Sequence, residues 1–273
     1  MRFVVRHETV LRYDPAVRHS IQYLRLTPRS EAGQRVLEWR IDAPGRQWHQ
    51  ADAYGNVVVV TSLSKRHDEV RIVAQGCVET FLIPETYLPH QSTLPPQAFL
   101  VPSALTQADD DIREMAAQCG PVDRDPPQVV QRMLRAISAR LDTMPRSERT
   151  EVLRAPAVLA RGRGTPEECT HVFLACARAA GLPARYVSGY TTVAPGRVDI
   201  HAWADVWIDQ RGWLSVDPAL ATWAGASSCR LATGRDELDA GPVRDSHHGV
   251  LGRSFTGASI TAETAPAGDP LQQ

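Results

Sequence analysis

A helix with two clearly marked ends is the feature of this sequence that most constrains its fold. Thr165 is followed directly by Pro166 and, three positions after the threonine, by Glu168, which is the pattern of an N-cap with a capping box. Gly181 supplies the matching stop signal at the C-terminal end. Three extended segments follow at short intervals, at residues 185–192, 201–208 and 212–216. This order predicts one helix that precedes a set of neighbouring strands.

The first 80 residues follow a different pattern, in which apolar and polar residues mostly alternate. Strand-forming residues recur there in short segments, and turn signals separate the segments. The turn signals are Asp14-Pro15, residues 43–45 and Gly55-Asn56. Several short strands with short turns predict a sandwich-like or barrel-like β-domain, which we place at residues 1–82.

The rest of the chain divides by composition. Residues 83–102 contain five prolines and no periodic pattern, which predicts a linker packed over the surface. Helical and extended segments resume after it, so we place the second domain at residues 103–255. Residues 256–273 are rich in glycine, alanine, threonine and proline, and this composition predicts a disordered tail.

Composition also excludes several classes of function. The 30 basic and 31 acidic side chains give a net charge of −1, which offers little attraction to nucleic acid or to an anionic membrane surface. No run of about 18 apolar residues predicts a membrane span, and the N-terminus lacks the apolar region of a secretory signal, so we expect a cytoplasmic protein. The five cysteines are scattered and odd in number, and none forms a Cys-x-x-Cys pair, which favours neither a disulfide framework nor a zinc site.

Three residues in the helix-and-strand segment form a pattern that suits cysteine chemistry. Cys169 lies near the start of the helix, where free N–H groups and the helix dipole stabilise a thiolate. His201 opens one strand and would accept the thiol proton, and Asp217 ends the next strand and would orient the imidazole. If these two strands are antiparallel neighbours, His201 and Asp217 face each other across the turn that joins the strands.

Several motifs in both halves of the chain are similar to those of one family. They are Gly181-Leu182-Pro183-Ala184-Arg185-Tyr186-Val187-Ser188-Gly189-Tyr190, His201-Ala202-Trp203, Gly212-Trp213, Asp217-Pro218, Leu24-Arg25-Leu26-Thr27-Pro28-Arg29, Asp52-Ala53-Tyr54-Gly55-Asn56, Gly234-Arg235-Asp236 and Pro242-Val243. Over residues 1–250 the chain resembles the transglutaminase-like, papain-related superfamily of cysteine hydrolases and acyltransferases, including the N-terminal domain of its bacterial members. The resemblance implies an α+β fold, with an N-terminal β-sandwich-like domain and a transglutaminase-like core whose site helix packs on an antiparallel sheet.

The resemblance also implies an activity. In that activity Cys169 would be the nucleophile, His201 the base and acid, and Asp217 the orienting carboxylate. The thiol would attack a peptide amide or isopeptide bond, form a thioester, and pass the acyl group to water or to an amine. Neither a metal nor an organic cofactor is needed for this chemistry. The implied partners are a peptide or protein substrate and, as for similar bacterial proteins, a complex with a peptide-ligase-like protein.

One position departs from the family pattern. The family nucleophile lies in a Gly-x-Cys motif, fifteen residues before the glycine that ends the helix, and counting back from Gly181 reaches Pro166. Cys169 is three residues later, which moves a side chain about 4.5 Å along the helix axis and about 60° around it. Two hypotheses therefore stay open. The protein is either an enzyme whose nucleophile is Cys169 or an inactive pseudoenzyme that binds a peptide or protein through the same cleft.

Other polar and aromatic residues in this region have simpler interpretations. Asp205 lies on the same strand face as His201, and we interpret it as structural support. His171 is interpreted as a helix-surface residue without a role. Trp203 and Trp213 alternate along strands, which is more typical of a core than of a substrate groove.

Overall fold

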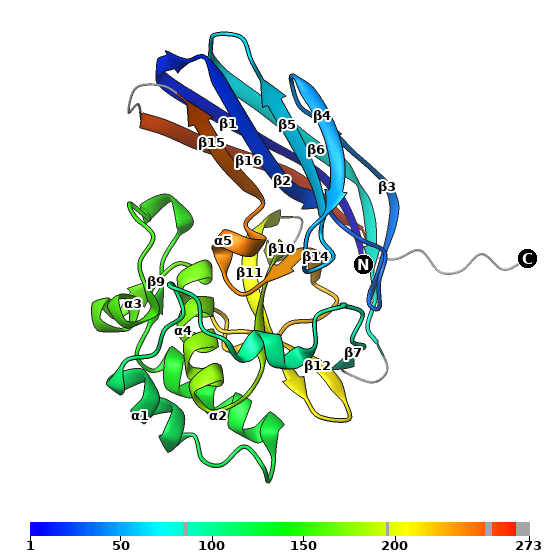
Figure 1. Cartoon of the computed structure of the whole chain (residues 1–273). Coiled ribbons are helices and arrows are strands. Elements are labelled where there is room, and N and C mark those ends of the chain that lie inside the picture. The colour runs from blue at the N-terminus through cyan, green and yellow to red at the C-terminus, as the bar shows by residue number, and fades with distance from the viewer. Residues whose placement is uncertain (84–86, 195–196, 249–252, 266–273) are drawn as a thin grey trace, which may run out of the picture.

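The N-terminal part of the protein is a sandwich of two antiparallel sheets (Figure 1). The computed structural model describes residues 1–83, 87–194, 197–248 and 253–265. The first sheet has the strand order β16-β1-β6-β3 and consists of β1 (Arg2–Val17), β3 (Gln34–Asp42), β6 (His67–Thr80) and β16 (Arg253–Ala265). The second has the order β15-β2-β5-β4 and consists of β2 (His19–Thr27), β4 (Arg46–Ala51), β5 (Val57–Leu63) and β15 (Val243–His248).

The alternation in the N-terminal sequence produces this sandwich. Along β1 every second side chain points inward, and Phe3, Val5 and Leu11 are buried together with Leu24 and Val59 of the opposite sheet. A strand of period two can bury one face and leave the other in solvent, and two such sheets close a core between them.

The C-terminal strands differ from the expected domain limits. β15 lies within the predicted second domain but pairs with β2 of the sandwich, and β16 pairs with β1 from Arg2↔Ala265 to Asp14↔Arg253. Residues 256–265 thus form a strand where the sequence predicts disorder, whereas residues 266–273 lie outside the described residues. The physical reason is that β1 offers a free edge whose backbone groups pair with any extended segment, whatever its side chains.

The second part of the chain packs four helices on one face of a mostly antiparallel sheet (Figure 1). The sheet has the order β13-β12-β11-β10-β14, with β7 (Tyr87–Leu88) also paired to β12. Its other strands are β10 (Ala184–Ala194), β11 (Arg197–Ile208), β12 (Gly212–Asp217), β13 (Thr222–Trp223) and β14 (Ser228–Gly234). The helices are α1 (Asp110–Gln118), α2 (Pro126–Ser138), α3 (Ala155–Arg161), α4 (Pro166–Ala179) and, near the sandwich, the single-turn α5 (Glu237–Ala240).

Short elements complete this part. They are the 3-10 helices η1 (Pro96–Leu100) and η2 (Arg146–Glu148) and the parallel pair β8 (Asp142–Thr143) and β9 (Arg163–Gly164). The α+β class, the sandwich and the helix-on-sheet core agree with the predicted fold. No helix within the described ranges is long and apolar enough to cross a membrane.

Helix α4 is the central element of the core. The capping box is formed, because Glu168 N–H donates to Thr165 Oγ1 over 3.4 Å and Thr165 N–H donates to Glu168 Oε2 over 3.0 Å. The sheet covers one side of α4 and α1–α3 cover the other, so that its side chains are buried on every face from Glu167 to Arg178. His171 is therefore fully buried, and its interpretation as a helix-surface residue is wrong.

Two side-chain amides of the sandwich form hydrogen bonds with the edge strand of this sheet. β14 lies at the edge of the sheet, where its outer backbone groups have no neighbouring strand. Gln34 pairs with both backbone groups of Arg230, at 2.8 Å and 3.0 Å, and Asn56 pairs with both backbone groups of Thr233, at 2.9 Å and 2.7 Å. Because a buried backbone group without a partner is costly, these amides stabilise both the strand edge and the junction.

Candidate active-site groove

A groove of about 1080 Å³ lies between the sandwich and the helix–sheet core. The core contributes the β8–η2 segment, the start of α4, the start of β11 and helix α5, and the sandwich contributes β1 and the start of β15. The lining residues are His7, Thr9, Thr143, Met144, Pro145, Arg146, Ser147, Val152, Pro166, Glu167, Arg197, Asp199, Ile200, His201, Glu237, Leu238, Gly241, Pro242, Val243, Arg244 and Asp245. Both charge signs and several apolar side chains thus face the same space.

His201 and Asp217 form a hydrogen-bonded pair beside the groove. His201 Nε2 lies 2.6 Å from Asp217 Oδ2, and both side chains are buried. The other oxygen, Oδ1, accepts from the backbone N–H of Ala219 at 3.0 Å and of Leu220 at 3.1 Å. The carboxylate is therefore fixed at both oxygens. His201 Nδ1 has no hydrogen-bond partner in the part of the chain that the structure describes, which makes it the ring nitrogen available to a ligand in the groove.

The start of helix α4 also lines the groove, and it presents no thiol there. Pro166 is the first residue of the helix, and it faces the same groove as His201. Proline carries neither a nucleophile nor a backbone N–H. The next residue, Glu167, is buried and pairs through its carboxylate with Arg146. Position 166 is thus in the groove, and it carries no nucleophilic group.

Cys169 lies one turn deeper and does not line the groove. Its side chain is 1% exposed and belongs to the apolar core between α4 and its neighbours. The thiol donates to the carbonyl oxygen of Gly164 at 3.6 Å. Burial, followed by the negative charges of Glu168 and Asp217, raises the pKa of this thiol to about 12. The structure therefore brings His201 and Asp217 together and leaves Cys169 outside the groove.

An ion-pair network at the start of α4 was not predicted from the sequence. Arg149 binds Glu237 through two nitrogens, at 2.9 Å and 2.8 Å, and Arg161 binds Glu168. The Arg149 guanidinium outweighs burial and holds the pKa of Glu237 below its ordinary value. The backbone N–H of Glu237 donates to His171 Nε2 at 3.2 Å, so the histidine positions α5 against the groove. The pair between Arg149 and Glu237 is not predictable from the sequence, because the two residues are far apart in the chain. Each of them alone is compatible with a solvated charge.

Asp205 is the centre of a second buried network, on the sheet behind the groove. Its carboxylate accepts from Arg185 Nε at 2.8 Å, from Arg230 Nη1 at 2.7 Å and from the Ser215 hydroxyl at 2.7 Å. Although burial opposes ionisation, the two arginines hold the pKa of Asp205 below its ordinary value. Three protein groups already engage this carboxylate, which fits a supporting role. Among the described residues, no group of three or more His, Cys, Asp or Glu side chains is placed to hold a metal ion.

Two family models match the sequence. The family described as the bacterial transglutaminase-like N-terminal region matches residues 3–79, which is the sandwich up to the end of β6. The family described as the transglutaminase-like superfamily matches residues 114–218, a range that contains α4, His201 and Asp217. The two matches thus cover most of the sandwich and much of the core, including Pro166, His201 and Asp217, whereas the groove residues at 237–245 lie outside them.

Some similar proteins match over most of their length, and another matches over a short segment only. An uncharacterized protein of Mycobacterium tuberculosis is 28% identical over 275 residues, covering 89% of this chain and 86% of that protein. A protein-glutamine gamma-glutamyltransferase of Pseudomonas aeruginosa is 42% identical over only 62 residues, which is 18% of this chain and 9% of that protein. A solved structure from Cytophaga hutchinsonii, proposed to be a cysteine protease, has a TM-score of 0.75 at 16% identity and covers 100% of this chain and 94% of that one. The chain therefore belongs to the transglutaminase-like superfamily and carries the N-terminal region of its bacterial members.

Proposed function

We propose that this protein binds a peptide or protein segment in the groove and does not form a thioester at helix α4. The observation that carries the proposal is the proline at the helix start, in the groove that His201 also lines. A thioester needs a thiolate within reach of both the imidazole and the substrate carbonyl. Pro166 supplies no sulfur, and Cys169 is enclosed in the core.

Proline at this position removes a second catalytic group as well. An oxyanion is stabilised by preorganised donors, and backbone N–H groups at a helix start are the usual source. Pro166 has no N–H to donate, and the N–H of Glu168 is engaged with Thr165. Both the nucleophile and its stabilising surroundings are thus replaced.

The groove nevertheless has the properties of a peptide site. Residues from both the sandwich and the core line it, and it offers apolar side chains beside hydrogen-bonding groups. Leu238 is 52% exposed, and Val152 is half-exposed, so each can gain burial when a ligand binds. Both charge signs along the walls suit a polypeptide better than a single highly charged molecule. Superfamily membership supports the same class of ligand, since the relatives named above include a protein-glutamine gamma-glutamyltransferase.

The test measures retention of peptides on the immobilised protein. The probe is a tryptic digest of casein, and mass spectrometry identifies retained peptides and any adduct on the protein. Leu238→Arg, which places a charge in the groove, should weaken retention about tenfold, the equivalent of losing about 1.4 kcal/mol. Leu220→Arg is the matched control, because Leu220 is 59% exposed and does not line the groove.

The outcomes separate the two hypotheses. Retention that Leu238→Arg weakens, without any thioester adduct, supports a binding protein. Equal retention by both variants would contradict binding in the groove. An acyl adduct on Cys169 that disappears in Cys169→Ala would instead establish the enzyme that the resemblance implies. A complex with a peptide-ligase-like protein stays a prediction from that resemblance.

A further inference from the structure

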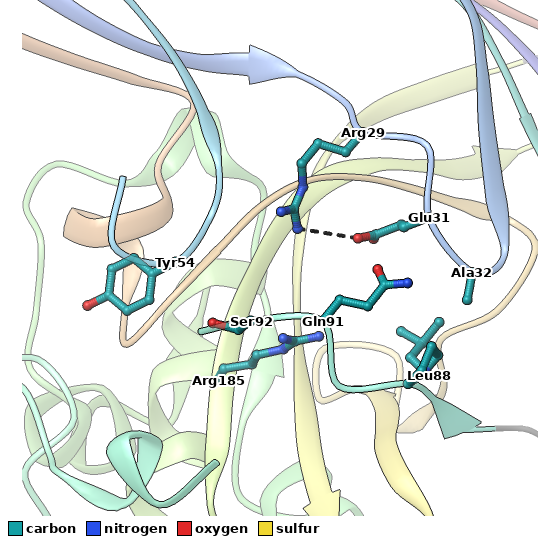
Figure 2. Close-up of a pocket in the computed structure, with 9 residues that line it drawn as sticks. Arg29, Glu31, Ala32, Tyr54, Leu88, Gln91, Ser92 and Arg185 are labelled. Carbon is teal, nitrogen blue, oxygen red and sulfur yellow. Dashed lines mark hydrogen bonds and ion pairs between the residues drawn. The ribbon is translucent and has the colours of Figure 1, made fainter. Parts of the chain in front are cut away.

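A small polar pocket lies where the sandwich, the proline-rich segment and the core sheet meet (Figure 2). We call it the Arg185 pocket. Its lining residues are Arg29, Glu31, Ala32, Tyr54, Leu88, Pro89, Gln91, Ser92 and Arg185. The space is about 20 Å³ and is partly open to solvent. This space suffices for one small polar group, since a single water needs roughly 10–15 Å³ by the same kind of measure. The pocket shares no lining residue with the groove.

Arg185 supplies unused hydrogen-bond donors to this pocket. Arg185 is 8% exposed, and its guanidinium stacks over Trp213 at 4.2 Å and donates through Nε to Asp205. Its two terminal nitrogens have no hydrogen-bond partner among the residues that the structure describes. Figure 2 shows the guanidinium extending from β10 toward Gln91 and Ser92. Neither nitrogen is fully shielded from solvent, so both can donate to a ligand that enters the pocket.

Arg230 shows the contrast within the same network. It binds Asp205 through both terminal nitrogens, at 2.7 Å and 3.1 Å, and its Nε lies 3.1 Å from Glu31. Asp205 and Glu31 together outweigh burial and raise the pKa of Arg230. For Arg185, burial outweighs the attraction of Asp205 and lowers the pKa. The positive charge of Arg185 is therefore the less compensated of the two.

The balance of charges around the pocket leads to the same conclusion. Three arginines, Arg29, Arg185 and Arg230, surround two carboxylates, Asp205 and Glu31, which leaves one positive charge in excess. Glu31 lies 3.3 Å from Arg29 Nη2 and 3.1 Å from Arg230 Nε, so its own charge is already paired. A ligand with one negative charge would neutralise the cluster. Burying an unpaired charge is costly, so such a ligand would gain from this site.

We propose that the Arg185 pocket binds a single carboxylate group. The two terminal nitrogens of Arg185 form a flat pair of donors, which matches the two oxygens of a carboxylate. Ser92 accepts from Leu94 N–H at 3.2 Å and keeps its own hydroxyl proton to donate, and the Gln91 amide adds a further donor at the opening. Because the enclosed space is small, only the head group enters, and the rest of the ligand lies in the opening. The carboxylate belongs either to a small free acid or to the C-terminus of a peptide.

The first experiment measures the thermal unfolding midpoint of the full chain as acetate replaces chloride at constant ionic strength. Acetate near saturation should raise the midpoint by about 2 °C, and neutral acetamide should have no effect. Triglycine with an N-terminal acetyl group is compared with the same peptide amidated at its C-terminus. A response to acetate alone identifies a small acid, whereas a response to the free-acid peptide identifies a chain terminus. No response to either, or an equal response to acetamide, overturns the proposal.

A substitution at the opening provides the second experiment. Gln91 is exposed and takes no part in the ion network, so Gln91→Glu should fold normally. The new carboxylate would pair with Arg185 in place of a free ligand. It should therefore raise the thermal unfolding midpoint by about 1 °C and abolish the response to free carboxylates. Gln50→Glu, on the exposed strand β4, is the matched control and should keep the full response. A full response in Gln91→Glu would also overturn the proposal, and neither result depends on what the groove binds.

Discussion

Replacing Pro166 by cysteine should create a reactive thiol in the groove. Position 166 is the first residue of α4 and faces the groove that His201 lines, so a sulfur there would meet both the helix dipole and an imidazole. The capping interactions of Thr165 and Glu168 do not involve the proline ring, and the helix start should therefore persist. The natural Cys169 serves as the internal reference in the same molecule.

The expected difference in alkylation rate between the two cysteines follows from the fraction of each thiol that is ionised. Cys169 has a pKa of about 12 against an ordinary value of 9.0, so at pH 7 its thiolate fraction is about a thousandth of that of an ordinary thiol. Its 1% exposure further restricts the approach of a reagent. A cysteine at position 166 would lie at the groove surface, and we expect it to ionise at least as readily as an ordinary thiol. It should therefore react at least about a thousand times faster than Cys169.

The assay is alkylation by iodoacetamide between pH 6 and pH 10, with each cysteine followed by mass spectrometry and glutathione as the free-thiol standard. Pro166→Ser is the matched control for the loss of the proline ring, and His201→Ala in the Pro166→Cys background tests the imidazole. Removing His201 should raise the apparent pKa of the new thiol. The reasoning is refuted if Cys169 of the natural protein reacts as fast as glutathione and loses this reactivity in His201→Ala. It is equally refuted if the new cysteine reacts no faster than Cys169.

Two further predictions concern stability. Asn56→Ala leaves the N–H and the C=O of Thr233 without partners at the buried edge of β14, and urea unfolding should show a loss of about 3 kcal/mol, against no measurable loss for the exposed Gln50→Ala. Burial and, to a lesser extent, the Arg146 charge lower the pKa of His7 from 6.5 to about 4. The unfolded chain therefore gains a proton at His7 before the folded protein does, and the unfolding free energy should fall by about 3 kcal/mol as the pH drops from 6.5 to 4. The difference between the natural protein and His7→Gln across this window isolates the contribution, and parallel curves would contradict it.

The sequence predicted those features of the fold that depend on contacts between residues close together in the chain. The capping box at Thr165 and Glu168 satisfies its own backbone groups, so four residues suffice to locate the start of α4. The contact between His201 and Asp217 was also within reach, because a hairpin brings the start of one strand beside the end of the next. In both cases the partners lie close in sequence.

Features that depend on distant partners were not predictable in this way. Residues 256–265 have a composition that predicts disorder, and only their backbone pairing with β1 makes them part of a strand. His171 looks like a surface residue until the helices and the sheet enclose α4 on all sides. The interaction between Arg149 and Glu237 joins residues 88 positions apart. No periodicity marks such a pair, since each charge alone is compatible with solvent.

The start of α4 shows how stability and chemistry compete for the same groups. A helix N-terminus has a limited number of free N–H groups and a positive electrostatic potential, and a catalytic thiolate would need both. In this protein the capping box uses the N–H groups of Thr165 and Glu168, Pro166 has no N–H, and the carboxylates of Glu167 and Glu168 lie at the positive end of the helix dipole. Arg146 and Arg161 then neutralise these two carboxylates in turn. Each of these features stabilises the helix, and each leaves fewer N–H groups or less positive potential to stabilise a thiolate. A helix start that is internally complete in this way is suited to holding the groove in shape rather than to activating a nucleophile.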